Sequence, residues 1–193
     1  MIRMATEQDL PRIREIYAPY VTGTTYSFEY SVPSLEEMQH RFRTFTPQFP
    51  WLVYEEEGRV LGYSYACAPF ERAAYGWLAE PAIYVDPEAR GRGIGRKLYD
   101  ALEKVLRLQG YQRLYVVITS ENTASVAFHE AVGYTHVATF PGCGIKFGRR
   151  VGTIWMEKVF ESVEIPSMPP APWRTVVEND GFFSEILNNL TLS

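Results

Sequence analysis

Cysteine is scarce in this chain of 193 residues. Its two cysteines, Cys67 and Cys143, are too few for a disulfide framework or for the ligand set of a structural zinc ion. The three histidines, His40, His129 and His136, are scattered and form no ligand pair with a cysteine or with each other. We therefore expect no bound metal and a reduced compartment.

Long apolar runs and an excess of positive charge are also lacking. No stretch approaches the ~20 apolar residues of a membrane span, and residues 1–9 hold no apolar segment suited to a signal peptide. Lys and Arg number 19 against 23 Asp and Glu, and this net charge of −4 argues against a nucleic-acid surface. We expect a cytoplasmic protein that binds a small molecule and contacts neither nucleic acid nor membrane.

Apolar residues, by contrast, make up 46% of the chain, which is too many for a disordered protein. The length suits one domain, or one domain with a tail. Apolar residues at helical spacing predict helices after Thr6, after Ser34 and over Ile94–Leu106. Glu37 supports Ser34 as a helix cap, and Gly110 ends the third helix.

β-rich runs alternate with these helices. The predicted strands are Trp51–Glu55, Val60–Cys67, Trp77–Val85, Leu114–Ile118, Tyr134–Phe140 and Thr153–Val159, with a short helix at Thr123–Val132. The turn at Glu56–Arg59 indicates that the first two strands form a hairpin. The continuous apolar run Leu114–Ile118 indicates a strand covered on both faces. The order of elements predicts one α/β domain over residues 1–160, with a mixed sheet and helices on its faces.

Residues 161–193 differ from the rest of the chain. Four prolines crowd the start of this tail and exclude a regular element there: Pro166, Pro169, Pro170 and Pro172. Beyond them, Phe182–Leu190 has the pattern of a short amphipathic helix. We expect this tail to pack on its own domain or on a second subunit.

The loop after the strand ending at Val85 carries the strongest functional signal. It alternates glycine with arginine in the order Arg90, Gly91, Arg92, Gly93, Ile94, Gly95 and Arg96. Glycines let the backbone approach a ligand closely, and the amides at the start of the following helix favour an anion, most often phosphate. A glycine-rich turn with solvated arginines would gain little stability by itself, so we interpret the loop as a phosphate-binding site.

Two common phosphate-binding motifs do not fit this loop. The Walker pattern requires Lys and then Ser or Thr after its last glycine, whereas Gly95 is followed by Arg96, Lys97 and Leu98. The dinucleotide fingerprint requires a second glycine spacing of three, whereas these glycines are spaced by two. The Arg/Gln-x-x-Gly-x-Gly/Ala signature of the GCN5-related N-acetyltransferases does fit, and the segment from Arg90 to Gly95 resembles it.

Further segments resemble one branch of that family, the phosphinothricin N-acetyltransferases. They are Phe49–Val53, Tyr75–Val85, His129–Tyr134 and Gly144–Gly148. The resemblance covers about residues 1–160 and implies a mostly antiparallel sheet with helices on both faces and a splayed central strand pair. It implies that the loop holds the pyrophosphate of acetyl-CoA, and that the acceptor is the α-amine of a small amino acid or analogue, such as phosphinothricin or methionine sulfoximine. It also implies a homodimer.

Two residues are candidates for catalysis. An amine attacks a thioester only when neutral, so a base with a raised pKa is useful, and the resemblance assigns that role to Glu80. Partial burial beside Trp77 would raise its pKa, although a solvated edge carboxylate is also possible. Many relatives place a Tyr four residues before the glycine that ends the next helix; His129 stands there and is a candidate proton donor to the leaving thiolate. A surface histidine near the helix end is the alternative.

The remaining candidates would hold the two substrates. In the family, the strand end comprising Ile83, Tyr84 and Val85 meets the pantetheine arm and polarises the thioester oxygen through a backbone amide. Asn122 matches a family residue that contacts pantetheine, and it would also serve as a helix cap. Three residues fall by resemblance on segments that line the acceptor pocket: Phe28, Arg72 and Tyr75. Arg72 would clamp a carboxylate or phosphinate, unless it is merely solvated.

Two rival functions are weaker. A non-catalytic acyl-CoA sensor would keep the loop but has no need of Glu80. An acetyltransferase for a protein terminus or lysine would need an open groove, whereas Phe28 and Tyr75 suggest a closed pocket for a small molecule. Direct transfer requires no acyl-enzyme, so we interpret Cys67 and Cys143 as packing residues rather than nucleophiles.

Overall fold

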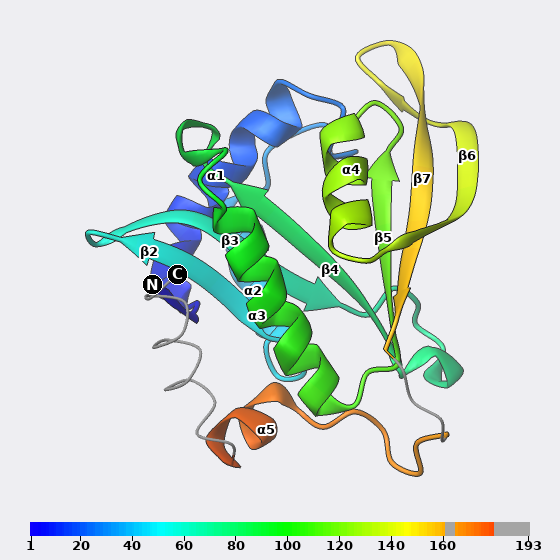
Figure 1. Cartoon of the computed structure of the whole chain (residues 1–193). Helices are drawn as coiled ribbons and strands as arrows, with labels where there is room; N and C mark the ends of the chain where they lie inside the picture. The colour runs from blue at the N-terminus through cyan, green and yellow to red at the C-terminus, as the bar shows by residue number, and fades with distance from the viewer. Residues whose placement is uncertain (161–164, 180–193) are drawn as a thin grey trace.

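The computed structural model describes residues 1–160 and 165–179 (Figure 1). Seven strands form one sheet in the order β1-β2-β3-β4-β5-β7-β6. The strands are β1 (Ile2–Met4), β2 (Trp51–Glu56), β3 (Arg59–Cys67), β4 (Leu78–Val85), β5 (Arg113–Thr119), β6 (Thr135–Lys146) and β7 (Arg149–Val159). The helices are α1 (Leu10–Thr22), α2 (Leu35–Phe45), α3 (Ile94–Gln109), α4 (Thr123–Ala131) and α5 (Trp173–Asn179). The helix predicted at Phe182–Leu190 lies outside the described residues.

Strands β4 and β5 are parallel, and every other neighbouring pair in the sheet is antiparallel. The parallel pairing joins Leu78 to Arg113 and Ala79 to Leu114, after which the two strands diverge towards their carboxyl ends (Figure 1). This arrangement confirms the predicted mixed sheet with a splayed central pair.

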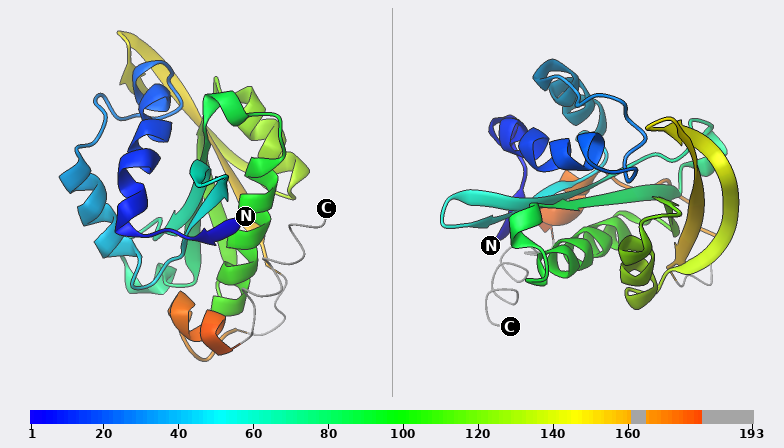
Figure 2. Two further views of the ribbon diagram at one scale, coloured as in Figure 1. Left: turned by 90° about the vertical axis from the view of Figure 1, so that its left-hand side faces the viewer. Right: turned by 90° about the horizontal axis from the view of Figure 1, so that it is seen from above.

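Helices cover both faces of the sheet, as Figure 2 shows from above. Helices α1 and α2 lie on one face, where Leu10, Ile13 and Ile16 pack in a buried cluster with Trp51 and Val53 of β2. Helix α3 lies on the other face, where Leu98, Leu102 and Leu106 are fully buried against the sheet. These two cores fix β4 between them, so its residues are held from both sides.

The local signals at the helix ends behave as predicted. The Ser34 side chain accepts a hydrogen bond of 3.1 Å from the Glu37 amide at the start of α2. Gly110 ends α3 with φ of 97°, a conformation that glycine adopts without steric cost. Because caps depend on a few consecutive residues, the sequence is sufficient to locate them.

Strand β5 differs from its prediction, because only one of its faces is covered. Leu114, Val116 and Ile118 are buried, whereas Val117 is 39% exposed. The apolar run gave no sign of this, because both sets of residues are hydrophobic. This face is exposed because the core on the α1 side of the sheet includes no residue of β5, so that Val117 borders the cavity instead.

Strands β6 and β7 are longer than predicted, since the stretch between residues 140 and 153 belongs largely to them. The register shifts between Phe140 and Gly144, where a bulge accommodates Pro141 within the edge strand. A tight turn then joins the strands through Phe147 and Gly148, both with positive φ.

The segment after the prolines contains a helix, α5, that the sequence pattern did not predict. Trp173 is buried, and its indole N–H donates a hydrogen bond of 2.7 Å to the carbonyl of Thr46. The Gln109 side chain donates a 2.7 Å bond to the carbonyl of Ala171. Residues 165–179 therefore pack on their own domain, one of the two expected arrangements.

Candidate active site

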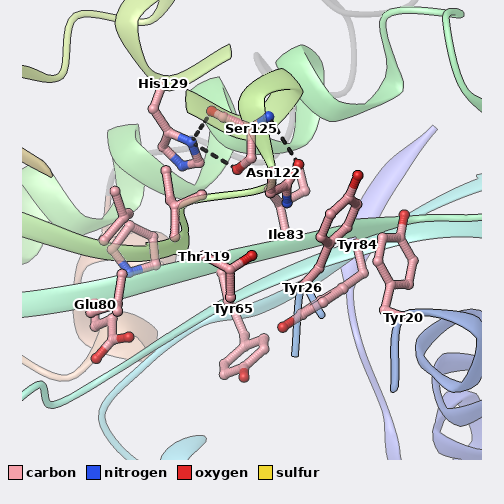
Figure 3. A pocket seen from close by; sticks show the side chains of 15 residues that line it. Tyr20, Tyr26, Tyr65, Glu80, Ile83, Tyr84, Thr119, Asn122, Ser125 and His129 are labelled. Carbon is pink, nitrogen blue, oxygen red and sulfur yellow. Dashed lines mark hydrogen bonds between the residues drawn. The ribbon is translucent and has the colours of Figure 1, made fainter. Parts of the chain in front are cut away.

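The divergence of β4 and β5 opens a cavity of about 170 Å³ (Figure 3). Residues 80–84 of β4 line one side, residues 116–119 of β5 line the other, and the remaining lining residues come from α4 with its cap and from three tyrosines of α1, the loop after it and β3. The sequence-predicted residues that the structure brings together here are Glu80, Ile83, Tyr84, Asn122 and His129. The cavity therefore lies where the central strands have separated.

The two faces of β4 serve different neighbours, because side chains alternate along a strand. Tyr84 packs edge-on against Tyr17 and Tyr20 of α1, so even-numbered residues face the α1 side. Glu80 has the same parity and lies on that face. A Cβ placed on Gly95 at the start of α3 would instead contact Ile83 and Val85. The carboxylate therefore faces the α1 side, and the glycine-rich loop lies on the α3 side.

The glycine-rich loop adopts the backbone that its sequence predicts. Gly91 has φ of 76°, and Gly93 has φ of 74° immediately before α3 begins. The first amides of a helix have no intrahelical acceptor, so the start of α3 presents N–H groups to an anion. At Gly95 the argument differs, because its φ is ordinary and a Cβ there would make only normal contacts with Ile83 and Val85 of β4.

The three arginines of this loop already have partners. Arg92 forms an ion pair of 2.6 Å with Glu56, and Arg96 pairs with Asp100 one helical turn later. The Arg90 guanidinium lies 5.0 Å from the centre of the Tyr20 ring. All three side chains are exposed, so exchanging these partners for a phosphate costs little desolvation.

Glu80 lines the cavity and directly follows Ala79, the last β4 residue that pairs with β5. Its side chain is about half-buried, and burial raises the pKa of its carboxyl group above the ordinary value. Cys67 pairs with it across the antiparallel β3–β4 ladder, and burial together with the nearby Glu80 raises the pKa of that thiol to about 12. The thiol is therefore protonated at neutral pH, and the Glu80 carboxyl group keeps its proton to a higher pH than an ordinary glutamate.

His129 is buried rather than at the surface, so the surface alternative was wrong. Its Nδ1 lies 2.7 Å from the Ser125 carbonyl oxygen, and its Nε2 lies 3.0 Å from the Tyr99 hydroxyl. Burial lowers the pKa of His129, so the ring is neutral at pH 7 and has one N–H group. A carbonyl can only accept, so Nδ1 donates to Ser125 and the Tyr99 hydroxyl donates to Nε2.

Two polar side chains complete the cavity beside α4. Asn122 accepts a hydrogen bond of 3.2 Å from the Ser125 amide, so it is the N-terminal cap of α4 as well as a lining residue. The Thr119 hydroxyl is buried at the end of β5 and has no hydrogen-bond partner within the described parts of the chain. A buried hydroxyl without a partner is unfavourable, so the site fits a ligand that supplies polar groups there.

The three predicted acceptor-binding residues do not line this cavity. Arg72 and Tyr75 are exposed and border a separate cavity of about 390 Å³, next to Pro169 and Pro170. Phe28 lies against β6, where a Cβ on Gly144 would approach its ring to 2.5 Å.

Sequence reasoning missed several tyrosines of the cavity, namely Tyr20, Tyr26 and Tyr65. Tyr65 is opposite Ala82 in the β3–β4 ladder, so the hairpin pattern contained a usable signal for it. Tyr20 and Tyr26 come from α1 and the loop after it, and nothing in the local pattern distinguishes them from packing residues.

The loop between α1 and α2 is fixed to β6 by contacts between residues more than a hundred positions apart. The Lys146 ammonium is buried and donates hydrogen bonds to the carbonyls of Val21 (2.7 Å) and Ser27 (2.6 Å). The Tyr30 hydroxyl donates a 2.7 Å bond to the carbonyl of Ile145. This loop clamp, made by Lys146 and Tyr30, places the segment that carries Tyr26 over the cavity.

Two other kinds of feature, a metal centre and a membrane span, are absent from the described residues. Residues 1–160 and 165–179 contain no group of three or more His, Cys, Asp or Glu able to hold a metal ion. In the same ranges, no helix is long and apolar enough to cross a membrane.

Comparison with known proteins identifies the family. The acetyltransferase (GNAT) domain family matches residues 2–155. The chain is 37% identical to a phosphinothricin N-acetyltransferase of Alcaligenes faecalis, over 81% of each chain. It is 34% identical to an L-methionine sulfoximine/L-methionine sulfone acetyltransferase of Pseudomonas aeruginosa, covering 89% of this chain and 98% of that one.

A solved structure supports the same assignment. It is a phosphinothricin acetyltransferase of Sinorhizobium meliloti in complex with acetyl-CoA, with a TM-score of 0.85 and 35% identity, covering 89% of this chain and 95% of that one. The expected fold and the expected family are thus both confirmed. The chain belongs to the acetyltransferase (GNAT) family.

Proposed function

We propose that this enzyme transfers the acetyl group of acetyl-CoA to the α-amine of a small amino acid or analogue, of the phosphinothricin or methionine sulfoximine kind. One observation carries the proposal: Glu80 and the part of β4 that has diverged from β5 line the same wall of the cavity. The relatives that act on phosphinothricin and on methionine sulfoximine support the choice of acceptor.

The coenzyme would lie on the α3 side of the splay. The amides at the start of α3, together with Arg90, Arg92 and Arg96, would hold its pyrophosphate, since each can exchange its present partner for an anion. The exposed backbone edge at Ile83 and Val85 would bind the extended pantetheine arm as a strand binds its neighbour, with Thr119 and Asn122 beside it. The coenzyme supplies the thioester on which the reaction takes place.

Glu80 would act as the general base, directly or through a water molecule. It faces the α1 side, from which an acceptor can approach the thioester without crossing the coenzyme. Its raised pKa lets it take a proton from an ammonium or attacking amine near neutral pH. A backbone amide at the end of β4 would polarise the thioester oxygen.

His129 is our proposed proton donor to the leaving thiolate, in a role secondary to that of Glu80. Its single N–H is held by the Ser125 carbonyl, so donation to a sulfur atom requires that hydrogen bond to break. Burial raises the pKa of Tyr99, so its hydroxyl keeps its proton, and the ring would take up a new proton from solvent after each transfer. Replacing His129 with Phe should lower kcat while leaving the acid limb of the pH profile in place.

The acceptor pocket would be completed by Phe28, Arg72 and Tyr75. Arg72 is exposed beside Tyr75, so its guanidinium is available to bind a carboxylate or phosphinate through two parallel hydrogen bonds. Because Arg72 and Tyr75 border the second cavity, the proposal places the acidic end of the acceptor between the two cavities.

We further propose a cytoplasmic homodimer built from an acetyltransferase domain over residues 1–160 and a tail over residues 161–193. Two-subunit assembly rests on the resemblance alone, and sedimentation of the purified full chain tests it. A monomer at micromolar concentration would contradict the dimer without affecting the proposed chemistry.

Thiol release tests the function directly. The protein is mixed with acetyl-CoA and, in separate reactions, with amino acids, methionine sulfoximine, phosphinothricin, polyamines and a peptide with a free N-terminus. We expect fast release with the small amino-acid analogues and loss of that release in Glu80→Gln. Tight coenzyme binding with no release on any amine would instead indicate a sensor, and release on the peptide alone would indicate a protein-modifying enzyme.

A further inference from the structure

The backbone of Val85 is the last ladder position of β4 before the glycine-rich loop. The Asp86 amide donates a hydrogen bond of 2.8 Å to the Leu61 carbonyl of β3. Successive peptide groups of a strand point to opposite edges, so the N–H and C=O groups of Val85 point away from β3. They lie on the edge that has already diverged from β5. This is the edge against which we place the pantetheine arm.

The side chain of Tyr20 forms hydrogen bonds with both the N–H and the C=O group of Val85. Its hydroxyl donates a hydrogen bond of 2.6 Å to the Val85 carbonyl and accepts one of 3.3 Å from the Val85 amide. One hydroxyl thus supplies the donor and the acceptor that a neighbouring strand would supply. Figure 3 shows Tyr20 beside Tyr84 among the residues that line the cavity.

Further contacts connect Tyr20 to the proposed coenzyme side and to the proposed acceptor side of the site. The guanidinium of Arg90, from the phosphate-binding loop, lies over its ring. The Tyr20 carbonyl accepts a hydrogen bond of 2.7 Å from the hydroxyl of Thr24, at the start of the loop that carries Tyr26. Pro19 precedes it within α1 and has no N–H group, so the last turn of the helix lacks one backbone hydrogen bond.

We propose that Tyr20 is a positioning residue. In the free protein its hydroxyl is hydrogen-bonded to the backbone of Val85 at the open edge of β4, and it gives up these bonds when the coenzyme binds there. The inference rests on the proposed function, because it places the coenzyme arm at this edge. The coenzyme and the Tyr20 hydroxyl then compete for the same two backbone groups. The last turn of α1 moves as the hydroxyl leaves, and through Thr24 this movement reaches the acceptor-side loop.

The replacement Tyr20→Phe tests the competition. It keeps the ring that packs on Tyr84 and removes only the hydroxyl. Calorimetry with coenzyme A should show a dissociation constant about two- to tenfold lower than that of the unchanged protein, because a competing hydrogen bond is gone. In the free variant, the Val85 amide should exchange with solvent faster, because its partner is missing.

Thr46→Val is the matched control. Its hydroxyl also donates a 2.7 Å bond to a backbone carbonyl, that of Phe42 in α2, and neither residue lines either cavity. It should leave the affinity for coenzyme A unchanged. Thermal unfolding of both variants establishes that each is folded at the temperature of the titration.

Three outcomes separate the hypotheses. An affinity that falls or stays constant in Tyr20→Phe would overturn the inference, since the hydroxyl would then assist the coenzyme or be indifferent to it. Binding by the unchanged protein, with thiol release on a small amine, would leave the proposed function standing in that case. No binding of coenzyme A by the unchanged protein would remove the proposed function itself.

Discussion

The two sides of the cleft are built in different ways. The α3 side is contiguous in sequence, since the strand end at Val85, the two left-handed glycines and the start of α3 follow one another within residues 83–96. The α1 side depends on contacts between distant residues, such as Lys146 with Ser27, 119 positions apart. The comparison teaches that this site combines a motif that local sequence encodes with a pocket that only the complete fold assembles.

The largest expected effect is at the point where the two sides meet. Glu80→Gln cannot take up a proton, so kcat/KM should fall by about 10²- to 10⁴-fold. In the unchanged enzyme, kcat/KM should drop as the pH falls through the raised pKa of Glu80, because the protonated carboxyl cannot act as a base. A pH–rate profile measures both, and an acid limb that persists in Glu80→Gln would assign the titration to another group.

The next effect would be confined to the α1 side. Lys146→Met leaves the carbonyls of Val21 and Ser27 buried without their donor, which should lower the free energy of unfolding by about 2–4 kcal/mol. The KM for the acceptor should rise while the KM for acetyl-CoA stays constant, because the loop clamp acts on the acceptor side.

Arg150→Met is the control for that change, since Arg150 is an exposed cation on β7, and its loss should alter stability by no more than about 0.5 kcal/mol. If Lys146→Met raised the KM for acetyl-CoA as much as the KM for the acceptor, the assignment of the acceptor to the α1 side and of acetyl-CoA to the α3 side would be wrong.

A smaller effect should be confined to the α3 side. Gly93→Ala forces a side chain into a left-handed conformation, at a cost of about 1–2 kcal/mol. Because this glycine directs the first amides of α3, the KM for acetyl-CoA should rise about tenfold, with the acceptor KM unchanged. Gly58→Ala has a matching φ of 75° in the β2–β3 turn and should destabilise the fold equally without affecting either KM.

The smallest effect concerns stability and pH. The folded state raises the pKa of Glu80, so it disfavours the ionised carboxylate and loses stability as the pH rises above the unfolded value of about 4.3. Glu80→Gln should therefore melt at a higher temperature than the unchanged protein at pH 8, by about 2–4 °C for each kcal/mol removed. The two should melt alike near pH 4. An equal difference at both pH values would show that Glu80 is not the cause.

Prediction from sequence succeeded where neighbouring residues decide the structure. The cap at Ser34, the turn at Gly110 and the left-handed glycines before α3 each depend on a few consecutive residues. It failed at Val117, because hydrophobicity alone cannot show that the core on the α1 side does not extend over β5. It also failed at α5, whose Trp173 is buried through contacts with residues far away in the chain.

The sequence by itself determined the α/β order of elements and the presence of a glycine-rich loop ahead of a long helix, because periodicity and glycine spacing are local properties. Only the tertiary structure decided that His129 is buried against Tyr99, that Lys146 holds the loop over the cavity, and that Tyr20 takes the open edge of β4. The reason is that burial and hydrogen-bond partners depend on which distant residues meet once the sheet and its helices have packed.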